Sequence, residues 1–182
     1  MGVCCTKDLY KDDPEVWFDS QKLLERDYGV GPLLGDGAFA RVVAVTRLRD
    51  GALFAAKVFK KHMDLNEANE LSVAPRAATL RREIDVLRRL AGSAHCVKLR
   101  GVLETPRDLY LLLECCAGGD LMHHIAKQDH FTPQDAARYF SHFCRAVAHC
   151  HGASVAHLDV KPENMLVSFD SRDRSRVVLS DF

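Results

Sequence analysis

The stretch HLDVKPEN, residues 157–164, decides the fold class of this chain, and the pair Asp181-Phe182 follows it after an apolar run. The stretch places Asp159, Lys161 and Asn164 on one proline-bearing loop. An aspartate can accept a hydroxyl proton, a lysine can contact a phosphate and an asparagine can hold a metal. Asp181 comes directly after an apolar strand, where a hard oxygen ligand can face Mg²⁺. A polar loop formed by chance is a poor explanation, because the segment is long and its order is right.

A second feature is Lys57, which interrupts the otherwise apolar run FAAKV at residues 54–58. A lysine is expensive to bury without an anionic partner, so the alternative is a solvated strand face. Glu83 offers that partner, because it lies three residues after Leu80 and four before Leu87. This spacing puts the carboxylate at the apolar edge of a helix. We expect a Lys57–Glu83 ion pair, and the alternative for Glu83 is an exposed helix residue beside neighbouring arginines.

A glycine-rich segment, GDGAFARV at residues 35–42, precedes both of these charges. Gly35 and Gly37 would let the backbone approach a phosphate closely and turn N–H groups toward it. The pattern G-x-G-x-x-G is met at two of its three positions, because Ala40 stands at the third. Taken alone, the segment is explained equally well by a tight hairpin turn.

Strands dominate the first two thirds of the chain and helices much of the rest. Residues 48–51 should join two strands as a hairpin turn, and residues 7–27 read as a polar lead-in. The expected strands are 41–47, 52–59, 97–103, 109–114, 165–167 and 177–180. A helix is expected over 75–90, and a second begins with Thr132 as N-cap and Pro133 as its first residue. Gly152 should end that helix as a C′ residue. Its apolar stripe comprises Ala136, Tyr139, Phe140, Phe143, Cys144 and Val147.

Composition narrows the class of protein. The 182 residues are 47% hydrophobic and 27% charged, as in ordinary soluble globular proteins. The formal net charge is zero, which argues against duplex nucleic acid as a partner, because neutralising phosphates needs a basic surplus. We expect neither a membrane-spanning helix nor a secretory signal. Seven cysteines without a CxxC motif indicate a reducing compartment rather than a disulfide framework.

The N-terminus reads MGVCCT, which fits the pattern for myristoylation of Gly2. A single myristoyl chain binds membranes only marginally, at about 10⁴ M⁻¹. Residues 1–20 contain two lysines against five acidic residues, so this segment repels anionic lipid. The second anchor would then be an acyl group on Cys4 or Cys5, which would place the chain at the cytoplasmic face of a membrane. The alternative is a disordered start that matches the pattern by chance.

Taken together, these segments resemble a eukaryotic protein kinase of the Ser/Thr type over about residues 28–182. The resemblance implies an α+β fold with a β-rich N-lobe and C-helix, followed by the first, mostly helical part of the C-lobe. The N-lobe and hinge would occupy residues 28–116 and the partial C-lobe residues 117–182. Residues 1–27 would be the lipidation segment and lead-in.

The resemblance also implies roles for individual residues. Asp159 would be the catalytic base and Lys161 a phosphate contact, while Lys57, fixed by Glu83, would position the phosphates of ATP. Asn164 and Asp181 would hold Mg²⁺. The other residues implied for the nucleotide site are Gly35, Gly37, Val42, Ala55, Leu113, Glu114, Cys116, Asp120 and Leu166. The expected partners are ATP and a protein carrying a Ser or Thr hydroxyl.

Three departures from the family pattern stand out. Ala40 replaces the third glycine, which would stiffen the loop without blocking ATP. Leu158 replaces the arginine that usually precedes the catalytic aspartate and pairs with a phosphorylated activation loop, so that control would have no cation to act on. The chain also ends at Phe182, one residue short of the D-F-G glycine. We therefore expect an incomplete kinase domain whose helix at 132–151 exposes apolar side chains.

The segment CAGGDL at residues 116–121, together with the N-terminal start, looks most like calcium-dependent and calmodulin-dependent kinases. Any coupling to calcium or calmodulin would act through regions outside this chain. The alternative function is a membrane-anchored, nucleotide-binding pseudokinase or scaffold without phosphotransfer. Retention of Lys57, Asp159, Asn164 and Asp181 favours the kinase.

Overall fold

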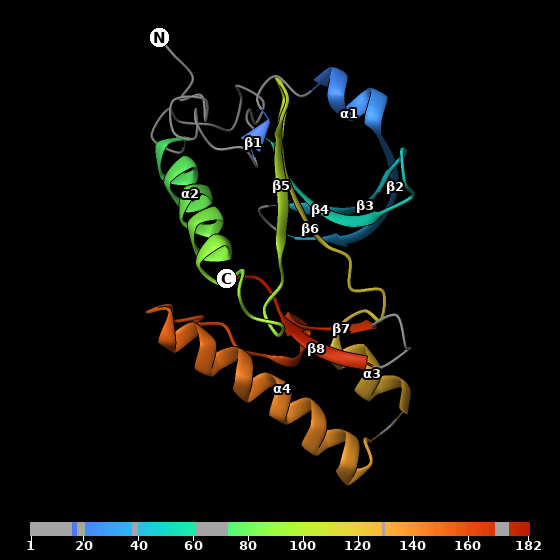
Figure 1. Ribbon diagram of the computed structural model, residues 1–182, viewed down its shortest axis with the longest axis vertical. Helices are drawn as coiled ribbons and strands as arrows, with labels where there is room; N and C mark the ends of the chain where they lie inside the picture. Colours follow the sequence, from blue (N-terminus) through green and yellow to red (C-terminus); the bar gives the residue numbers. More distant parts are fainter. Residues whose placement is uncertain (1–15, 18–20, 38–39, 61–72, 129, 170–174) are drawn as a thin grey trace. The chain divides into compact units, whose positions relative to one another are not determined.

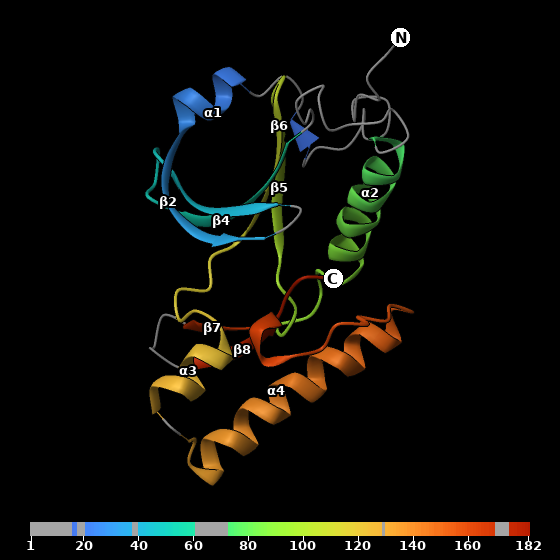
Figure 2. The same cartoon turned by 180° about the vertical axis from the view of Figure 1, so that it is seen from behind.

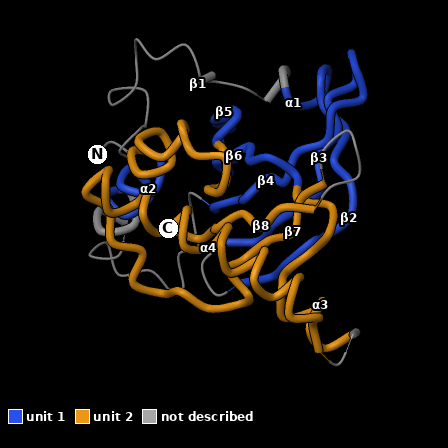
Figure 3. Tube along the Cα trace, turned by 60° about the horizontal axis from the view of Figure 1, so that its bottom comes forward, with its two compact units in different colours: residues 1–84, 99–115 blue, residues 85–98, 116–182 orange. Residues whose placement is uncertain are grey.

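The computed structural model describes residues 16–17, 21–37, 40–60, 73–128, 130–169 and 175–182. The chain forms two compact units, coloured blue and orange in Figure 3. The first unit comprises residues 1–84 and 99–115, and the second comprises residues 85–98 and 116–182. The lobe boundaries implied by the resemblance stay a prediction. No helix in the described part of the chain has the length and apolar character needed to cross a membrane.

The first unit is built on a six-stranded sheet with the order β1-β5-β6-β4-β3-β2 (Figure 1). All neighbouring strands are antiparallel except β1 and β5, which run parallel. The strands are β1 Val16–Trp17, β2 Tyr28–Asp36, β3 Arg41–Arg47, β4 Leu53–Lys60, β5 Leu99–Glu104 and β6 Asp108–Glu114. A seven-residue helix, α1 at Gln21–Asp27, precedes β2.

The hairpin expected between β3 and β4 is confirmed. Gly51 adopts a φ of 71°, in the left-handed region that glycine enters without steric cost. Arg47 N donates to Ala52 O across 2.8 Å, which closes the turn. On the same turn, the Arg47 guanidinium donates to the Asp50 carboxylate across 2.8 Å. The register of β4 follows from this turn.

Burial alternates along the central strands, so one face of the sheet lies on the core and the other face is partly exposed. In β4 the residues Phe54, Ala56 and Val58 are buried, while those between them are partly exposed. Side chains two residues apart point to the same face of a sheet, so the three form one buried row. The core of the first unit consists of Leu24, Val43, Val45, Phe54, Ala56, Val58, Leu103 and Leu112.

Helix α2 spans Val73–Arg89, close to the expected 75–90. Ile84, Leu87 and Leu90 are at most 2% exposed, as their helical spacing predicts. Leu80, which belongs to the same spacing, is only partly buried. The helix continues from the first unit into the second, because the division between them falls after Ile84.

Besides the end of α2, the described residues of the second unit form two helices, a short 3-10 turn and a two-stranded antiparallel sheet, seen from behind in Figure 2. These elements are α3 Leu121–Gln128, α4 Pro133–Gly152, η3 Pro162–Asn164, β7 Met165–Phe169 and β8 Ser175–Leu179. One buried cluster joins Leu90 and Cys96 to Ala146 and Cys150 of α4 and Leu179 of β8. The unit therefore depends on contacts that are distant in sequence.

Helix α4 begins as the sequence predicts. Thr132 is the N-cap, its hydroxyl accepts from Asp135 N, and Pro133 is the first helical residue. The predicted end is wrong, because Gly152 is still helical. Ala153 N donates to His149 O, and Ser154 takes the left-handed conformation with a φ of 55°. The left-handed residue that follows the helix therefore lies two positions later than expected.

The apolar stripe expected on α4 is divided in the structure. Tyr139 packs edge-on against Phe131, with ring centroids 5.2 Å apart, and Val147 lies against the buried cluster of the second unit. Phe140 is 65% exposed and Cys144 is also exposed. The helix residues buried most completely are Ala146 and Cys150, which the predicted stripe did not contain.

The lead-in expected over residues 7–27 contains two elements that were not predicted, β1 and α1. Leu24 of α1 is 6% exposed and belongs to the core of the first unit. Two adjacent leucines in a seven-residue helix give no helical period, so the sequence pattern offered no signal.

Candidate functional site

Lys57 and Glu83 form an ion pair inside the first unit. Lys57 lies in β4 and Glu83 in α2, and Nζ donates to Oε1 across 2.7 Å. The side chains are 18% and 12% exposed, so both charges are partly desolvated and each offsets the cost of burying the other. The Phe59 ring centroid lies 5.7 Å from Nζ and adds a cation–π contact. The expected pair forms, and the solvated alternative for Lys57 is wrong.

Cross-strand register gathers several predicted nucleotide-site residues on one face of the sheet. Val42 of β3 lies opposite Lys57, and Ala55 of β4 lies opposite Leu113 of β6. Paired residues point to the same face, and so do residues two apart along one strand. Since the core row of β4 points to the other face, these side chains share the face that carries the Lys57 ammonium.

The glycine-rich segment forms the turn between β2 and β3. Gly35 pairs with Val42, and Gly37 N donates to Ala40 O across 3.0 Å. The tip, residues 38–39, lies outside the described residues. The hairpin is therefore present, and its use as a phosphate-binding loop stays a prediction. Gly35 at the base of this hairpin lies level with Lys57 across the sheet, because Val42 pairs with both residues.

In the second unit, Asp159, Lys161 and Asn164 are joined by hydrogen bonds. Lys161 Nζ donates to Asp159 Oδ2 across 2.7 Å, and Asn164 Nδ2 donates to the same oxygen across 3.1 Å. Asn164 Nδ2 also donates to Asp159 O across 2.8 Å. These donors, Lys161 first, lower the pKa of Asp159 below its usual value. The lowered pKa keeps the carboxylate ionised at neutral pH, and the Asp159 side chain is 61% exposed.

Asp181 is positioned through the residue before it. Ser180 N donates to Asn164 O across 2.8 Å, and His157 Nε2 donates to Ser180 O across 2.7 Å. His157 Nδ1 in turn accepts from Asp159 N across 3.3 Å. The ring of Phe182 lies 4.9 Å from that of His157, centroid to centroid. The loop that carries Asp159 and Asn164 therefore fixes the backbone that leads to Asp181.

Two residues of this region have left-handed backbones. Leu158 has a φ of 67° and Asp181 a φ of 58°. Such conformations cost about 1–3 kcal/mol for a residue other than glycine and occur often at functional sites. Leu158 is also 93% exposed, so its side chain gains little from packing. The loop holds these backbones against their local preference.

The remaining predicted residues of the second unit lie where the chain enters α3. Asp120 forms a bridge with Leu166, and its carboxylate accepts from His123 N across 2.7 Å. Gly118 approaches β7 so closely that an added Cβ would lie 2.7 Å from Val167 O. Gly119 N donates to Cys116 O across 3.2 Å. The close approach fixes the register of Asp120 on β7.

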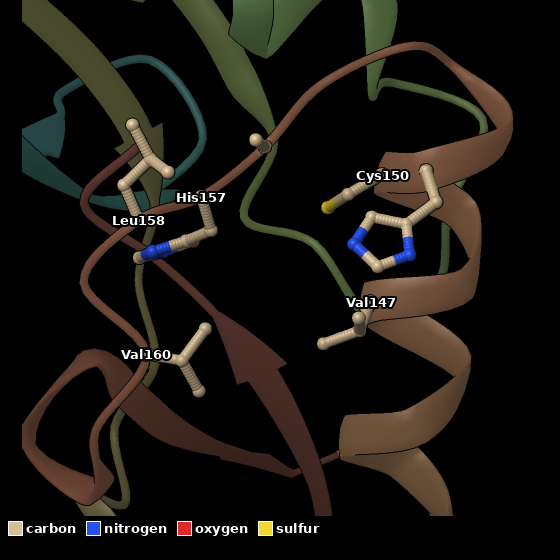
Figure 4. A pocket seen from close by; sticks show the side chains of 7 residues that line it. Val147, Cys150, His157, Leu158 and Val160 are labelled. Atoms are coloured by element: carbon tan, nitrogen blue, oxygen red, sulfur yellow. The ribbon is translucent and has the colours of Figure 1, made fainter.

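A shallow pocket of about 180 Å³ lies beside the Asp159 loop. Figure 4 shows Val147 and Cys150 of α4 on one side of it and His157, Leu158 and Val160 of the loop on the other. Its lining is mainly apolar and does not include Asp159, Lys161 or Asn164. Burial raises the pKa of the Cys150 thiol to about 12, so this group is neutral.

The donor set suits a hard divalent cation. Since Asp159 O can only accept, Asn164 must turn its amide nitrogen toward it, which leaves the amide oxygen for a ligand. Asp181 contributes a carboxylate. Mg²⁺ commonly takes one or two protein carboxylates together with phosphate oxygens and waters. Among the described residues no group of three or more His, Cys, Asp or Glu side chains could hold a metal without other ligands.

The predicted residues thus fall into two sets. The first unit holds Gly35, Gly37, Val42, Ala55, Lys57, Glu83, Leu113 and Glu114. The second holds Cys116, Asp120, Asp159, Lys161, Asn164, Leu166 and Asp181. Gly2, Cys4 and Cys5 lie outside the described residues. The sequence did not point to Gly118 or Ser180 as supports, because their partners come from distant parts of the chain.

Comparison with known families identifies this chain. The family described as "Protein kinase domain" matches residues 28–182. These bounds agree with the extent expected from the motifs. The match covers the strands from β2 onward, both predicted sets of site residues and the Asp181-Phe182 end.

Individual relatives agree with the family match. CBL-interacting protein kinase 22 of Oryza sativa subsp. japonica is 34% identical over 90% of this chain and 37% of its own length. CBL-interacting serine/threonine-protein kinase 7 of Arabidopsis thaliana is 32% identical over 88% of this chain and 35% of its own. Calcium-dependent protein kinase 19 of the same plant is 30% identical over 87% and 28%. The chain therefore spans less than two fifths of the length of these relatives.

Proposed function

The chain belongs to the protein kinase family, and on this basis we propose that it provides the nucleotide-binding and catalytic residues of an ATP-dependent serine/threonine kinase. The observation that carries the proposal is the hydrogen-bonded group of Asp159, Lys161 and Asn164. A carboxylate kept ionised beside a lysine and an amide suits the orientation of a hydroxyl for attack on a phosphate.

In the proposed reaction, the Asp159 carboxylate orients the substrate hydroxyl and accepts its proton. Lys161 donates to Asp159 and also supplies a cation for the phosphate. Lys57 contacts the non-transferred phosphates of ATP, and Glu83 fixes its direction through the 2.7 Å pair. The protein contributes mainly positioning and electrostatic stabilisation, because phosphoryl transfer needs little covalent chemistry from it.

Asn164 and Asp181 would hold the divalent ion that protein kinases use, which we propose to be Mg²⁺. When bound, such an ion neutralises negative charge on the phosphates. Ser180 supports this arrangement, because its backbone N–H donates to Asn164 O and so connects the two ligand residues. Loss of that connection would move Asp181 relative to Asn164.

A Ser or Thr hydroxyl is the proposed acceptor. Lys161, two residues after Asp159, is typical of Ser/Thr kinases, and the name of the relative CBL-interacting serine/threonine-protein kinase 7 states that specificity.

The test measures transfer of labelled γ-phosphate from ATP to a Ser-containing and a Tyr-containing basic peptide. Wild type should label the Ser peptide, and Asp159→Asn should lose at least about a hundredfold in rate, as expected on removing a general base. Asp50→Asn, at an exposed carboxylate of the β3–β4 turn, is the matched control and should keep full activity.

Equal rates for wild type and Asp159→Asn would refute the proposed chemistry. Nucleotide binding without any transfer in either protein would instead identify a nucleotide-binding scaffold. Preferential labelling of the Tyr peptide would refute the Ser/Thr specificity alone.

We also propose that Gly2 carries a myristoyl group and that Cys4 or Cys5 carries a second acyl chain, which would anchor the protein at the cytoplasmic face of a membrane. The MGVCCT start and the acidic character of residues 1–20 support two acyl anchors rather than a basic patch. Gly2→Ala should move the protein to the soluble fraction of eukaryotic cells, whereas the control Val3→Ala should not. Membrane retention of Gly2→Ala would refute the proposal.

A further inference from the structure

Two histidine rings bind the backbone of one residue of β8. The ring of His95, from the segment after α2, and the ring of His142, from α4, stack with centroids 4.6 Å apart and planes 22° apart. His95 Nδ1 lies 3.1 Å from Val177 O, and Val177 N donates to His142 Nδ1 across 3.2 Å. All three residues belong to the second unit.

These contacts determine where the protons are. A carbonyl oxygen only accepts, so His95 must carry its proton on Nδ1. A backbone N–H only donates, so Nδ1 of His142 must be unprotonated and its proton must lie on Nε2. A second proton on His142 would occupy Nδ1 and remove the acceptor for Val177 N–H. The geometry therefore requires a neutral His142.

The strand held in this way leads directly to Asp181. The same strand is paired with the segment of His95, since Leu179 N donates to His95 O and Val97 N donates to Leu179 O, each across 2.9 Å. Ser180 is then bonded to Asn164 O. Val177 is thus the first of several consecutive anchor points between β8 and Asp181.

The charged groups around His142 are mainly cationic. Arg138 and Arg145 come from its own helix, Arg176 from β8, and His95 from the segment that stacks on it. Arg138 is also paired with Asp135 across 2.7 Å, and Arg176 donates to Ala94 O. Burial first, then the neighbouring His95 ring and the three arginines, lower the pKa of His142 below 6.5.

We propose that His95 and His142 form a pH-sensitive positioning pair, which holds β8 and with it Asp181 while His142 is neutral and releases Val177 when His142 is protonated. The consequence at Asp181 rests on the function proposed above, whereas the release of Val177 does not. Neither histidine touches the reacting groups, so both act through the backbone of β8.

The direction of the effect follows from linkage. In the unfolded chain a histidine titrates near its usual pKa of 6.5, above that of His142 in the folded state. Between these two values the unfolded state binds more protons, so stability rises with pH. The pair is therefore fully effective above about pH 6.5 and is lost as the pH falls through the folded pKa of His142. Below that pKa the neutral fraction falls about tenfold per pH unit.

Hydrogen exchange of the Val177 amide on the whole chain tests the pair directly. After correction for the intrinsic exchange rate, protection of this amide in wild type should fall about tenfold per pH unit below the pKa of His142. His142→Asn keeps an acceptor at the position of Nδ1 that does not titrate, so its protection should be flat with pH. His142→Leu should lose protection at every pH. His149→Asn, on the same helix, is the matched control and should behave as wild type.

A pH-independent Val177 amide in wild type would overturn the proposal, and so would identical profiles for wild type and His142→Asn. If His142→Leu fails to fold, the comparison of wild type with His142→Asn still tests the pH-dependent release of Val177.

The functional arm measures Mg²⁺-dependent binding of ADP between pH 7.5 and 5.5. Wild type should lose affinity on acidification and His142→Asn should lose less. Absence of nucleotide binding at every pH would contradict the proposed function, while the amide exchange would still decide the role of the pair.

Discussion

The molecule contains two lysine–carboxylate pairs of the same length in opposite surroundings. Lys57–Glu83 and Lys161–Asp159 both measure 2.7 Å. The first joins a strand to a helix 26 residues later, with side chains 18% and 12% exposed. The second joins residues two apart on a loop, with side chains 45% and 61% exposed. Equal distances therefore do not mean equal roles.

Under the proposed function, the partly buried pair positions the nucleotide and the exposed pair contains the carboxylate that accepts the hydroxyl proton. A partly buried pair is costly to break, because removal of one partner leaves a charge with little solvent. An exposed pair contributes little to stability. In the proposed reaction, its value lies in keeping the Asp159 carboxylate ionised and directed toward the substrate hydroxyl. Substitutions in the two pairs separate these roles.

Glu83→Gln should destabilise the protein by about 2–3 kcal/mol, below the 3–5 kcal/mol typical of a fully buried pair. The remaining amide cannot balance the Lys57 ammonium. Chemical denaturation measures the change, and Lys57→Met combined with Glu83→Gln should recover more than half of it. Wild-type stability for Glu83→Gln would show that the pair contributes no more than an exposed one.

Gly118→Ala should cost about 1–3 kcal/mol, the range seen for overpacking. Its Cβ would lie 2.7 Å from Val167 O and 2.8 Å from the Val167 side chain. Gly152→Ala, at the end of α4, meets nothing within 4 Å and should instead stabilise by about 0.5–1 kcal/mol. Thermal unfolding compares the two. Equal effects would mean that the approach of residue 118 to β7 does not constrain the second unit.

Leu158→Asn should stabilise the protein by about 0.5–1 kcal/mol, because asparagine enters the left-handed region more readily than leucine. Leu158 is 93% exposed at a φ of 67°, so little packing is lost. Val160→Asn is the control, since Val160 is 45% exposed and is not among the residues with positive φ. A destabilised Leu158→Asn would show that Leu158 has a packing role on the loop.

Lys161→Met should leave the free energy of unfolding within experimental error but change the charge state of its partner. The Lys161 hydrogen bond is the largest cause of the lowered pKa of Asp159. Without it the carboxyl pKa should rise toward 3.8, so that Asp159 loses its charge at a higher pH during acidification. A ¹³C NMR titration of the carboxyl group measures this. An unchanged titration would assign the lowered pKa to Asn164.

Much of this site could be predicted because its signals are local. The Lys57–Glu83 pair was predicted from the apolar neighbours of Lys57 and the helical spacing around Glu83. The start of α4 was predicted from Thr132-Pro133. The predicted end of α4 was wrong because Ser154, not Gly152, takes the left-handed conformation after the helix. The prediction missed the most buried residues of α4, Ala146 and Cys150. They are buried because β8 and the segment around Cys96 pack against them.

The side chains that hold β8 in the second unit had no local sequence signal. His95 and Val177 are 82 residues apart, and His142 and Val177 are 35 apart. Each histidine alone looks like a surface residue. Only the fold brings them to one backbone unit, so neither periodicity nor motif spacing reveals them.

The division of the chain into units has a practical consequence for protein engineering. The polypeptide passes from one unit to the other after residues 84, 98 and 115, so neither unit is a contiguous fragment. Expression of residues 116–182 alone would omit His95 and Cys96. β8 would then lose its contacts with these two residues. Dissection of this protein therefore calls for a short designed linker that splices residue 98 to residue 116, rather than a single truncation.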